Sequence, residues 1–348
     1  MDTEVKPTAS TAATGVIPAS NREHLLTVVF GLWMTIGLFL DGYFHQNLES
    51  DEESFLTPWH GVFYAGFAAS VLWLAAMSRR RSAGEVDWSL RSLPPGYDGA
   101  RAGIALFALG GVGDAAWHTA FGVERGIDAL LSPTHLVLFV GLQLILTAPL
   151  RAARLDPRPS RWILVGSLTS ATALAGFFLN FAWGLGISAL ARVPYDPVTE
   201  AGETQVIAGV ASMLVTTAVL FAAARVLLRH TATPVGAFTV LFAVAATLVS
   251  VAFDEDFEGV IAAVLAGAAL DAALRRQPLR NAHVAGMFGV VAGGMWLVYL
   301  GLLATDGIEW QPEIWMGGSV LSALAAYAIA AVLPVVDEPS TSLPGAAT

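Results

Sequence analysis

Two stretches of the sequence repeat one arrangement of aspartate and histidine. The first, LDGYFHQNLESDEESFLTPWHGVFYAGF (40–67), contains Asp41, His45 and His60. The second, GDAAWHTAFGVERGIDALLSPTHLVLFVG (113–141), contains Asp114, His118 and His135. Carboxylates and imidazoles are ligands for transition metals, and they are also common proton-transfer groups. Because both stretches adjoin apolar sequence, where ionisable groups are costly, these residues are candidates for a functional site.

The spacing within each stretch predicts that its three side chains converge. The aspartate and the first histidine are four residues apart, so they share one face of a helix. The second histidine follows Thr57-Pro58-Trp59 or Ser132-Pro133-Thr134. Thr or Ser followed by Pro is typical of a helix N-cap and first position, which places this histidine in the first turn. An antiparallel hairpin brings these helix ends together, so we expect two closed Asp-His-His sets.

An Asp-His-His set suits Cu(II), Zn(II) or Fe(II), and three protein ligands leave a coordination position open for water, oxygen or substrate. The chain has no cysteine, so thiolate sites and disulfides are excluded. Two alternatives stay open at this point, namely polar packing between helices and a proton relay without metal. The spacing does not determine whether the two sets form separate sites or one composite site.

Other residues near the two sets are candidates for pocket walls or supporting contacts: Trp59, Tyr64, Trp117, Glu124 and Asn180. Asn180 opens NFAWG (180–184), which lines up with DAAWH (114–118). This alignment indicates an eroded third copy, because the returning helix near Thr204 has no histidine. The acidic run FDEDFEG (253–259) is interpreted as a solvated loop that could also collect cations.

The composition identifies the elements that must position these residues. Of the 348 residues, 55% are hydrophobic and 13% are charged, and the mean hydropathy is +0.63. Soluble domains carry about 25% charged residues. The apolar runs approach the roughly 20 residues needed to cross a bilayer and predict an all-α, polytopic membrane bundle of about ten transmembrane helices in repeated hairpins. The expected spans begin near His24, Pro58, Ala100, Pro133, Arg161, Thr204, Pro234, Glu258, Ala282 and Pro312.

These spans predict a single transmembrane domain over residues 23–335, with metal-site hairpins at 24–78 and 100–150. Residues 1–22 are rich in Ser, Thr and Ala and lack the basic and apolar regions of a signal peptide. We interpret them as a flexible cytoplasmic tail, and residues 336–348 as a second one.

The distribution of basic residues predicts the orientation. With a cytoplasmic N-terminus, 16 of the 18 Lys and Arg residues fall on the cytoplasmic side, and only Arg125 and Arg192 fall outside. This asymmetry predicts cytoplasmic termini in the plasma membrane, with both metal sets toward the extracytoplasmic side. The remaining histidines, His24, His230 and His283, then lie at cytoplasmic helix ends and are interpreted as interfacial residues without a special role.

At DAAWH with SPTH, and at DGYFH with TPWH, the sequence resembles the C subunit of the copper membrane monooxygenases, the particulate methane and ammonia monooxygenase family. That family carries an Asp-x-x-x-His pair and a Thr-Pro-Ser-His element that opens the next helix. The resemblance covers two hairpins and implies an all-helical membrane protein that holds copper through both sets. Two features depart from the family. The Asn180 hairpin lacks the histidines of the family's Asn-x-x-x-His site, and here 14 and 16 residues separate the histidines of the two loops, more than in the family.

Three functions are compatible with these observations. The first is a copper-dependent, monooxygenase-like oxidoreductase that activates oxygen against a small apolar or lipid-soluble substrate. The second is a zinc hydrolase that attacks a lipid amide or ester, with Asp114 or Glu124 as the base. The third is a non-catalytic protein for metal binding or delivery. Copper is the expected metal, with zinc or iron as alternatives. The expected partners are the lipid bilayer and either other subunits or further copies of the chain, and no nucleic acid is expected.

Overall fold

The computed structural model describes residues 17–47, 57–82, 84–85, 88–122, 124, 126–155, 159–194, 196, 198–230, 233–253, 257–275 and 281–333. Within these ranges the regular structure is helical, without strands, as the sequence predicts. The helices are α1 (Asn21–Asn47), α2 (Pro58–Arg79), α3 (Asp98–Phe121), α4 (Ile127–Leu131), α5 (Pro133–Leu146), α6 (Ala148–Ala153), α7 (Arg161–Phe178), η1 (Asn180–Ala182), η2 (Gly184–Gly186), α8 (Ser188–Ala191), α9 (Glu200–His230), α10 (Ala237–Phe253), α11 (Phe257–Leu274), α12 (Asn281–Leu303) and α13 (Pro312–Val332).

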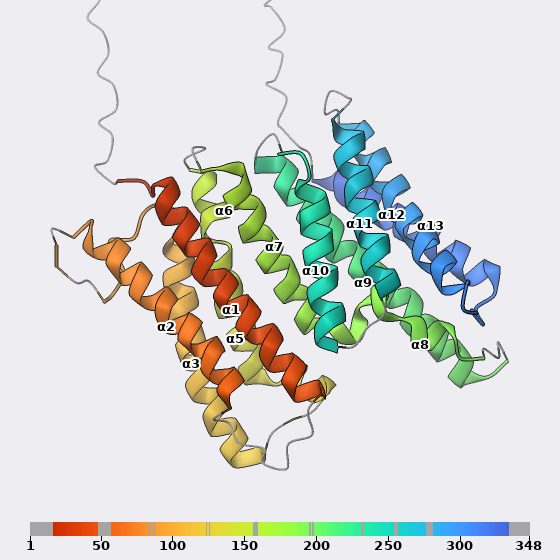
Figure 1. Cartoon of the computed structure of the whole chain (residues 1–348), viewed down its shortest axis with the longest axis horizontal. Coiled ribbons are helices and arrows are strands. Elements are labelled where there is room, and N and C mark those ends of the chain that lie inside the picture. Colours follow the sequence, from red (N-terminus) through yellow and green to blue (C-terminus); the bar gives the residue numbers. More distant parts are fainter. Residues whose placement is uncertain are drawn as a thin grey trace, which may run out of the picture.

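The long helices form an elongated bundle in which they run along roughly one direction. Figure 1 shows α2 and α3 at one edge, α7 and α10 in the middle, and α12 and α13 at the other edge. Consecutive helices pack as antiparallel hairpins, with α1 against α2, α3 against α5, α10 against α11 and α12 against α13. These four hairpins follow the repeated-hairpin plan that the sequence predicts, whereas α7 packs more extensively against α10 than against α9, its expected partner.

Seven of the described helices are long and apolar enough to cross a membrane, as expected for a multi-pass membrane protein: α1, α2, α7, α9, α11, α12 and α13. α5 and α10 are apolar but shorter. α3 is long enough, but it carries Asp114 and His118, which lower its hydropathy. A helix begins within four residues of each of the ten expected span starts.

Glycines allow the helices of the two metal-site hairpins to approach closely. A Cβ atom at Gly37 on α1 would lie 2.8 Å from the Cα of Phe63 on α2. A Cβ atom at Gly103 on α3 would lie 2.6 Å from the carbonyl oxygen of Gly141 on α5. Small residues at such crossings are typical of membrane helix packing. The close crossings hold each hairpin at a fixed spacing, and this spacing positions the side chains at the hairpin tip.

We call the tip of the two hairpins the site end, where α1 and α3 finish and α2 and α5 begin, and we call the opposite end the far end. At the far end, Arg81 donates two hydrogen bonds of 2.9 Å to the Glu23 carboxylate. His24 Nδ1 lies 2.8 Å from the Tyr97 hydroxyl, and both side chains are buried. His24 is therefore a packed structural residue and not an interfacial one, whereas His283 is exposed as expected.

The third hairpin departs from the expected repeat. α7 ends at Phe178, and Asn180 lies in the short 3-10 helix η1 instead of on a continuous helix. Trp183 is 2% exposed and packs against Gly176, and Gly184 N–H donates to the Thr216 hydroxyl. The chain here folds back into the core, so NFAWG does not reproduce the geometry of DAAWH.

Several expected features lie outside the described residues. They are residues 1–16 of the first tail, the acidic connection 49–53, Arg125, residues 254–256 of the acidic run, and the second tail. Glu258, which follows the acidic run, is described and lies 3.9 Å from Arg192.

Candidate metal centre

The second Asp-His-His set joins α3 to the first turn of α5. Asp114 and His118 are one turn apart near the site end of α3, and His135 is the third residue of α5. Asp114 Oδ1 lies 3.5 Å from His118 Nε2 and 3.1 Å from His135 Nε2. One ligand atom from each residue lies within 4.8 Å of the others. The predicted convergence of these three side chains is confirmed, and they could hold one metal ion.

Backbone carbonyl groups orient both histidine rings of this set. His135 Nδ1 lies 2.5 Å from the carbonyl oxygen of Ala129 in α4. His118 Nδ1 lies 3.2 Å from the carbonyl oxygen of Gly122, the residue that caps α3. Gly122 has a φ of +85°, a conformation that glycine adopts without steric strain. In both rings the Nδ1 atom therefore faces an acceptor, and Nε2 faces the aspartate.

This arrangement favours one tautomer of the two rings. A carbonyl oxygen can only accept a hydrogen bond, so each Nδ1 atom must carry a proton. A neutral imidazole has only one N–H group, so its Nε2 atom then presents a lone pair to the Asp114 carboxylate. Each of these lone pairs, at 3.5 Å for His118 and 3.1 Å for His135, is repelled by the anionic oxygen of Asp114 unless a cation lies between them. The second set is thus built for a metal ion or for added protons on both rings.

Two further side chains support the second set. The Thr134 hydroxyl donates a hydrogen bond of 2.8 Å to Asp114 Oδ1, and it is itself 2.9 Å from the Ser132 hydroxyl. Ser132 occupies the N-cap position of α5, but its side chain makes no capping hydrogen bond because it pairs with Thr134. Glu124 Oε2 lies 3.2 Å from His118 Nδ1. Partners of this kind hold the ligand rings in place in metal sites.

The first Asp-His-His set occupies the corresponding position between α1 and α2. Asp41 Oδ1 lies 3.1 Å from His60 Nδ1 and 3.7 Å from His45 Nε2, and the three ligand atoms again lie within 4.8 Å of one another. Thr57 caps α2 by accepting a hydrogen bond from the backbone N–H of His60, as the sequence predicts. The Thr57 hydroxyl also lies 3.0 Å from His60 Nδ1, and either tautomer of this ring is compatible with that contact.

Both aspartates are buried. Asp114 is 1% exposed and Asp41 is 8% exposed. Among the described residues, neither carboxylate pairs with a lysine or an arginine, and Asp41 Oδ1 makes no aligned hydrogen bond. Moving an unpaired carboxylate out of water is costly, and a bound cation removes that cost.

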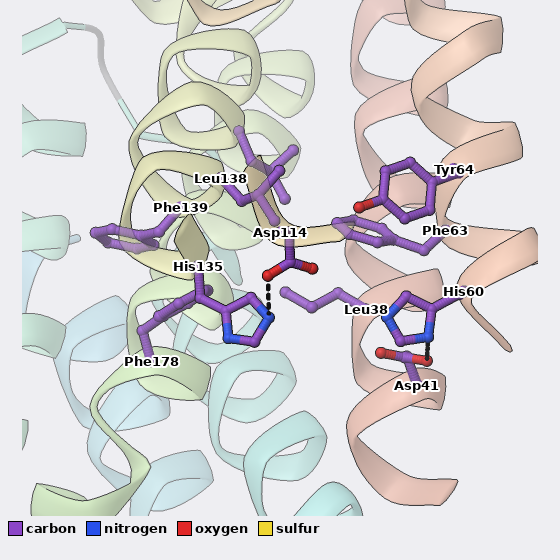
Figure 2. Close-up of a pocket in the computed structure, with 11 residues that line it drawn as sticks. Leu38, Asp41, His60, Phe63, Tyr64, Asp114, His135, Leu138, Phe139 and Phe178 are labelled. Carbon is purple, nitrogen blue, oxygen red and sulfur yellow. Dashed lines mark ion pairs between the residues drawn. The ribbon is translucent and has the colours of Figure 1, made fainter. Parts of the chain in front are cut away.

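The two sets face one small cavity. It has a volume of about 50 Å³ and is lined by Asp41, His60, Tyr64, Asp114 and His135, together with apolar side chains such as Leu38 and Phe178. Figure 2 shows the Asp114–His135 pair on one side of this space and the Asp41–His60 pair on the other. One water needs about 10–15 Å³ of such space, so the cavity admits only a small molecule or group. Each hairpin thus presents its carboxylate and one imidazole, that of His60 or His135, to a common chamber, whereas His45 and His118 are not among the lining residues.

The other candidate residues have different placements. Tyr64 lines the cavity, and its ring stacks on His60. Trp59 stacks on Phe44 and Trp117 packs against Phe121, and neither tryptophan is among the residues that line the cavity. Asn180 is not among them either. Three residues that the sequence did not predict contact the second set: Thr134, Ala129 and Gly122. Only Thr134 could have been found from the sequence, because it has a hydroxyl group and directly precedes a candidate ligand.

No family model matches the chain, and neither a curated protein nor a solved structure matches it significantly.

Proposed function

We propose that this protein is an integral membrane metalloprotein with two copper sites, one formed by Asp41, His45 and His60 and the other by Asp114, His118 and His135. The observation that carries the proposal is the orientation of the two rings in the second set. Their Nδ1 atoms face backbone carbonyl oxygens, and their Nε2 atoms face one buried carboxylate oxygen. A divalent cation at the centre of the set would satisfy all three ligand atoms together.

Copper is favoured over zinc and iron by the resemblance of both motifs to the copper membrane monooxygenases. Two imidazoles and a carboxylate are compatible with all three metals. Bound copper would supply one-electron chemistry and a position for oxygen. In this proposal the aspartates offset the charge of the metal, the backbone carbonyl groups hold the histidine rings, and Tyr64 closes the wall of the chamber between the two sets.

The hydrolase alternative requires a carboxylate that is free to accept a proton from water. Asp114 already accepts from Thr134 and faces two imidazoles, and Glu124 lies against His118. Asp114 is therefore engaged in the second set, whereas neither carboxylate oxygen of Glu124 makes an aligned hydrogen bond with a described residue. The contacts of Asp114 argue against it as a hydrolytic base and leave Glu124 as the candidate base of the hydrolase alternative.

The decisive experiment is the metal content of purified protein in detergent, compared between wild type, His118→Ala and the control His283→Ala. His283 is exposed and lies on α12, away from both sets. We expect His118→Ala to lose the metal of the second set and His283→Ala to lose none. An electron paramagnetic resonance signal that disappears with reductant would identify copper. Stoichiometric zinc would refute the copper assignment and favour the hydrolase, and unchanged metal in His118→Ala would refute metal binding by this set.

The proposal also includes ten membrane spans with cytoplasmic termini, which place both sites toward the extracytoplasmic side. The asymmetry of basic residues supports it, because 16 of the 18 lie on one side in this topology. Single cysteines at 49–53 should react with an impermeant thiol reagent on intact cells, whereas Ser82→Cys and Arg154→Cys should not. Labelling at 82 or 154 would reverse the orientation.

A further inference from the structure

A second, larger space lies between α2 and α3. It is a groove of about 830 Å³, and it is lined on one side by α2 residues from Pro58 to Phe67 and on the other by α3 residues from Phe107 to Ala115. Within the described part of the chain, α2 and α3 pack less closely than the two helices of either hairpin. The groove therefore separates the α1–α2 hairpin from the α3–α5 hairpin.

The lining of the groove is apolar and in part made of small residues. Gly61, Ala108, Gly111 and Ala115 are its small lining residues, and Phe67 and Phe107 are its large apolar ones. A Cβ atom at Gly61 would meet nothing within 4 Å. Val112, at the rim, is 74% exposed. In the proposed ten-span topology α2 and α3 both cross the membrane, so the groove would open to hydrocarbon and not to water.

The groove and the chamber meet at two side chains. His60 and Tyr64 line both spaces, and they are the polar lining residues of the groove along with Thr57. Figure 2 shows Tyr64 and His60 on the same side of the chamber, above and beside Asp41. A molecule in the groove would thus meet apolar surface along most of its length and an imidazole and a phenol at one end.

We infer that this groove binds a lipid-soluble molecule with a hydrocarbon chain and places one end of that molecule at His60 and Tyr64. The inference rests on the proposed function, and it specifies the substrate class of the metal sites. The two volumes carry the argument. The chamber of about 50 Å³ admits only a small group, whereas 830 Å³ lies within the range of about 300–1,000 Å³ that holds drug-sized ligands.

A chain-bearing occupant fits these volumes better than a gas molecule. A groove of this size offers a gas molecule few contacts, since dispersion attraction depends on atoms packed on all sides. A chain fills the groove along its length and directs its end toward the metal sets. Transfer of the chain from the bilayer, which is already apolar, releases less free energy than transfer from water. Specificity therefore comes from the shape of the groove and from the polar groups at its end.

The test uses a long-chain alcohol that carries an alkyl diazirine, photolysed with full-length protein in detergent and mapped by peptide mass spectrometry. Cross-links should concentrate on residues 57–67 and 107–115 and should be competed by dodecanol. Gly61→Leu places a branched side chain in the groove and should reduce this labelling several-fold, because the side chain takes the space of the alkyl chain. Gly317→Leu on α13 is the matched control, because Gly317 is also exposed with nothing near its Cβ position.

Val112→Trp, at the exposed rim, provides a second block that does not depend on Gly61. Even labelling of all lipid-facing helices, or equal labelling of the Gly61→Leu and Gly317→Leu proteins, would overturn the inference. Metal content is measured on the same samples and should stay at the wild-type level in all three variants. Groove labelling in a protein that binds no metal would refute the proposed function and leave the binding groove in place.

Discussion

The two Asp-His-His sets have the same plan but different surroundings. In the second set both histidine rings contact backbone carbonyl groups, and Asp114 accepts a hydrogen bond from Thr134. In the first set Asp41 Oδ1 makes no aligned hydrogen bond with a described residue, and the His45 side chain is 44% exposed, compared with 9% for His118. The comparison shows that the ligands alone do not define a metal site, because the groups around them decide how firmly the site is held.

A single helix position accounts for the difference in hydrogen bonding to the two aspartates. The residue before the last histidine is Trp59 in the first set and Thr134 in the second. Thr134 donates to the aspartate, whereas Trp59 stacks on Phe44, with ring centroids 3.4 Å apart. We therefore expect the second set to bind metal more tightly and the first set to exchange its metal more readily.

The largest effect should follow from removal of the carboxylate charge in the second set. Asp114→Asn keeps the size of the side chain but leaves a buried cation without its counter-charge, a loss of about 3–5 kcal/mol for a buried pair. Metal affinity of the second set, measured by competition with a chelator, should fall by at least about a hundredfold. The first set should keep its metal. Loss of both metals from this one change would show that the sets form a single composite site.

Substitution of the residue before the last histidine in each set should reduce the difference in metal affinity between the two sets. Thr134→Val removes the hydroxyl donor at constant shape and should weaken metal binding at the second set by about 10–100-fold, the usual effect of losing a supporting contact. Trp59→Thr should strengthen binding at the first set, although loss of the Phe44 stacking costs about 0.5–1.5 kcal/mol of stability. Chelator competition on both variants tests this pair. Equal affinities in Thr134→Val and wild type would contradict the role assigned to the hydroxyl.

A smaller effect is expected from Glu124→Gln. His118 Nδ1 keeps the Gly122 carbonyl oxygen as an acceptor, so the ring should stay in place while the carboxylate charge beside it is lost. We expect about a tenfold loss of affinity at the second set and no change in thermal stability. A change at the first set instead of the second would show that Glu124 acts elsewhere.

The smallest effect should come from Thr57→Ala, which removes the cap of α2. Loss of an N-cap hydroxyl costs about 1 kcal/mol. The melting temperature should decrease slightly, and the first set should weaken because His60 loses a contact to its ring. Ser132→Ala is the matched change at α5 and should spare helix stability, since Ser132 does not cap. Equal destabilisation by the two changes would contradict this assignment.

The sequence predicted the parts of the site that depend on local geometry. Four-residue spacing placed Asp114 beside His118, and the Ser-Pro start placed His135 in the first turn of the returning helix. It did not predict α4, whose Ala129 carbonyl group faces His135, because five residues inside a polar loop carry no clear helical pattern. The shared chamber and the groove depend on how one hairpin is rotated against the other, and no pattern within a single hairpin encodes that rotation.

The far end of the molecule has a mechanical consequence for the groove. There, α2 and α3 are joined through a separate apolar cluster that includes Leu74, Met77, Tyr97 and Ala100. α2 and α3 are therefore held together at the far end and separated by the groove toward the site end. His60 lies fourteen residues from Leu74, a lever arm of roughly 20 Å at 1.5 Å per residue. A rotation of about 5° at this cluster would move the α2 residues that line the groove by roughly 2 Å, so substitutions among these far-end side chains are expected to change the width of the groove mouth.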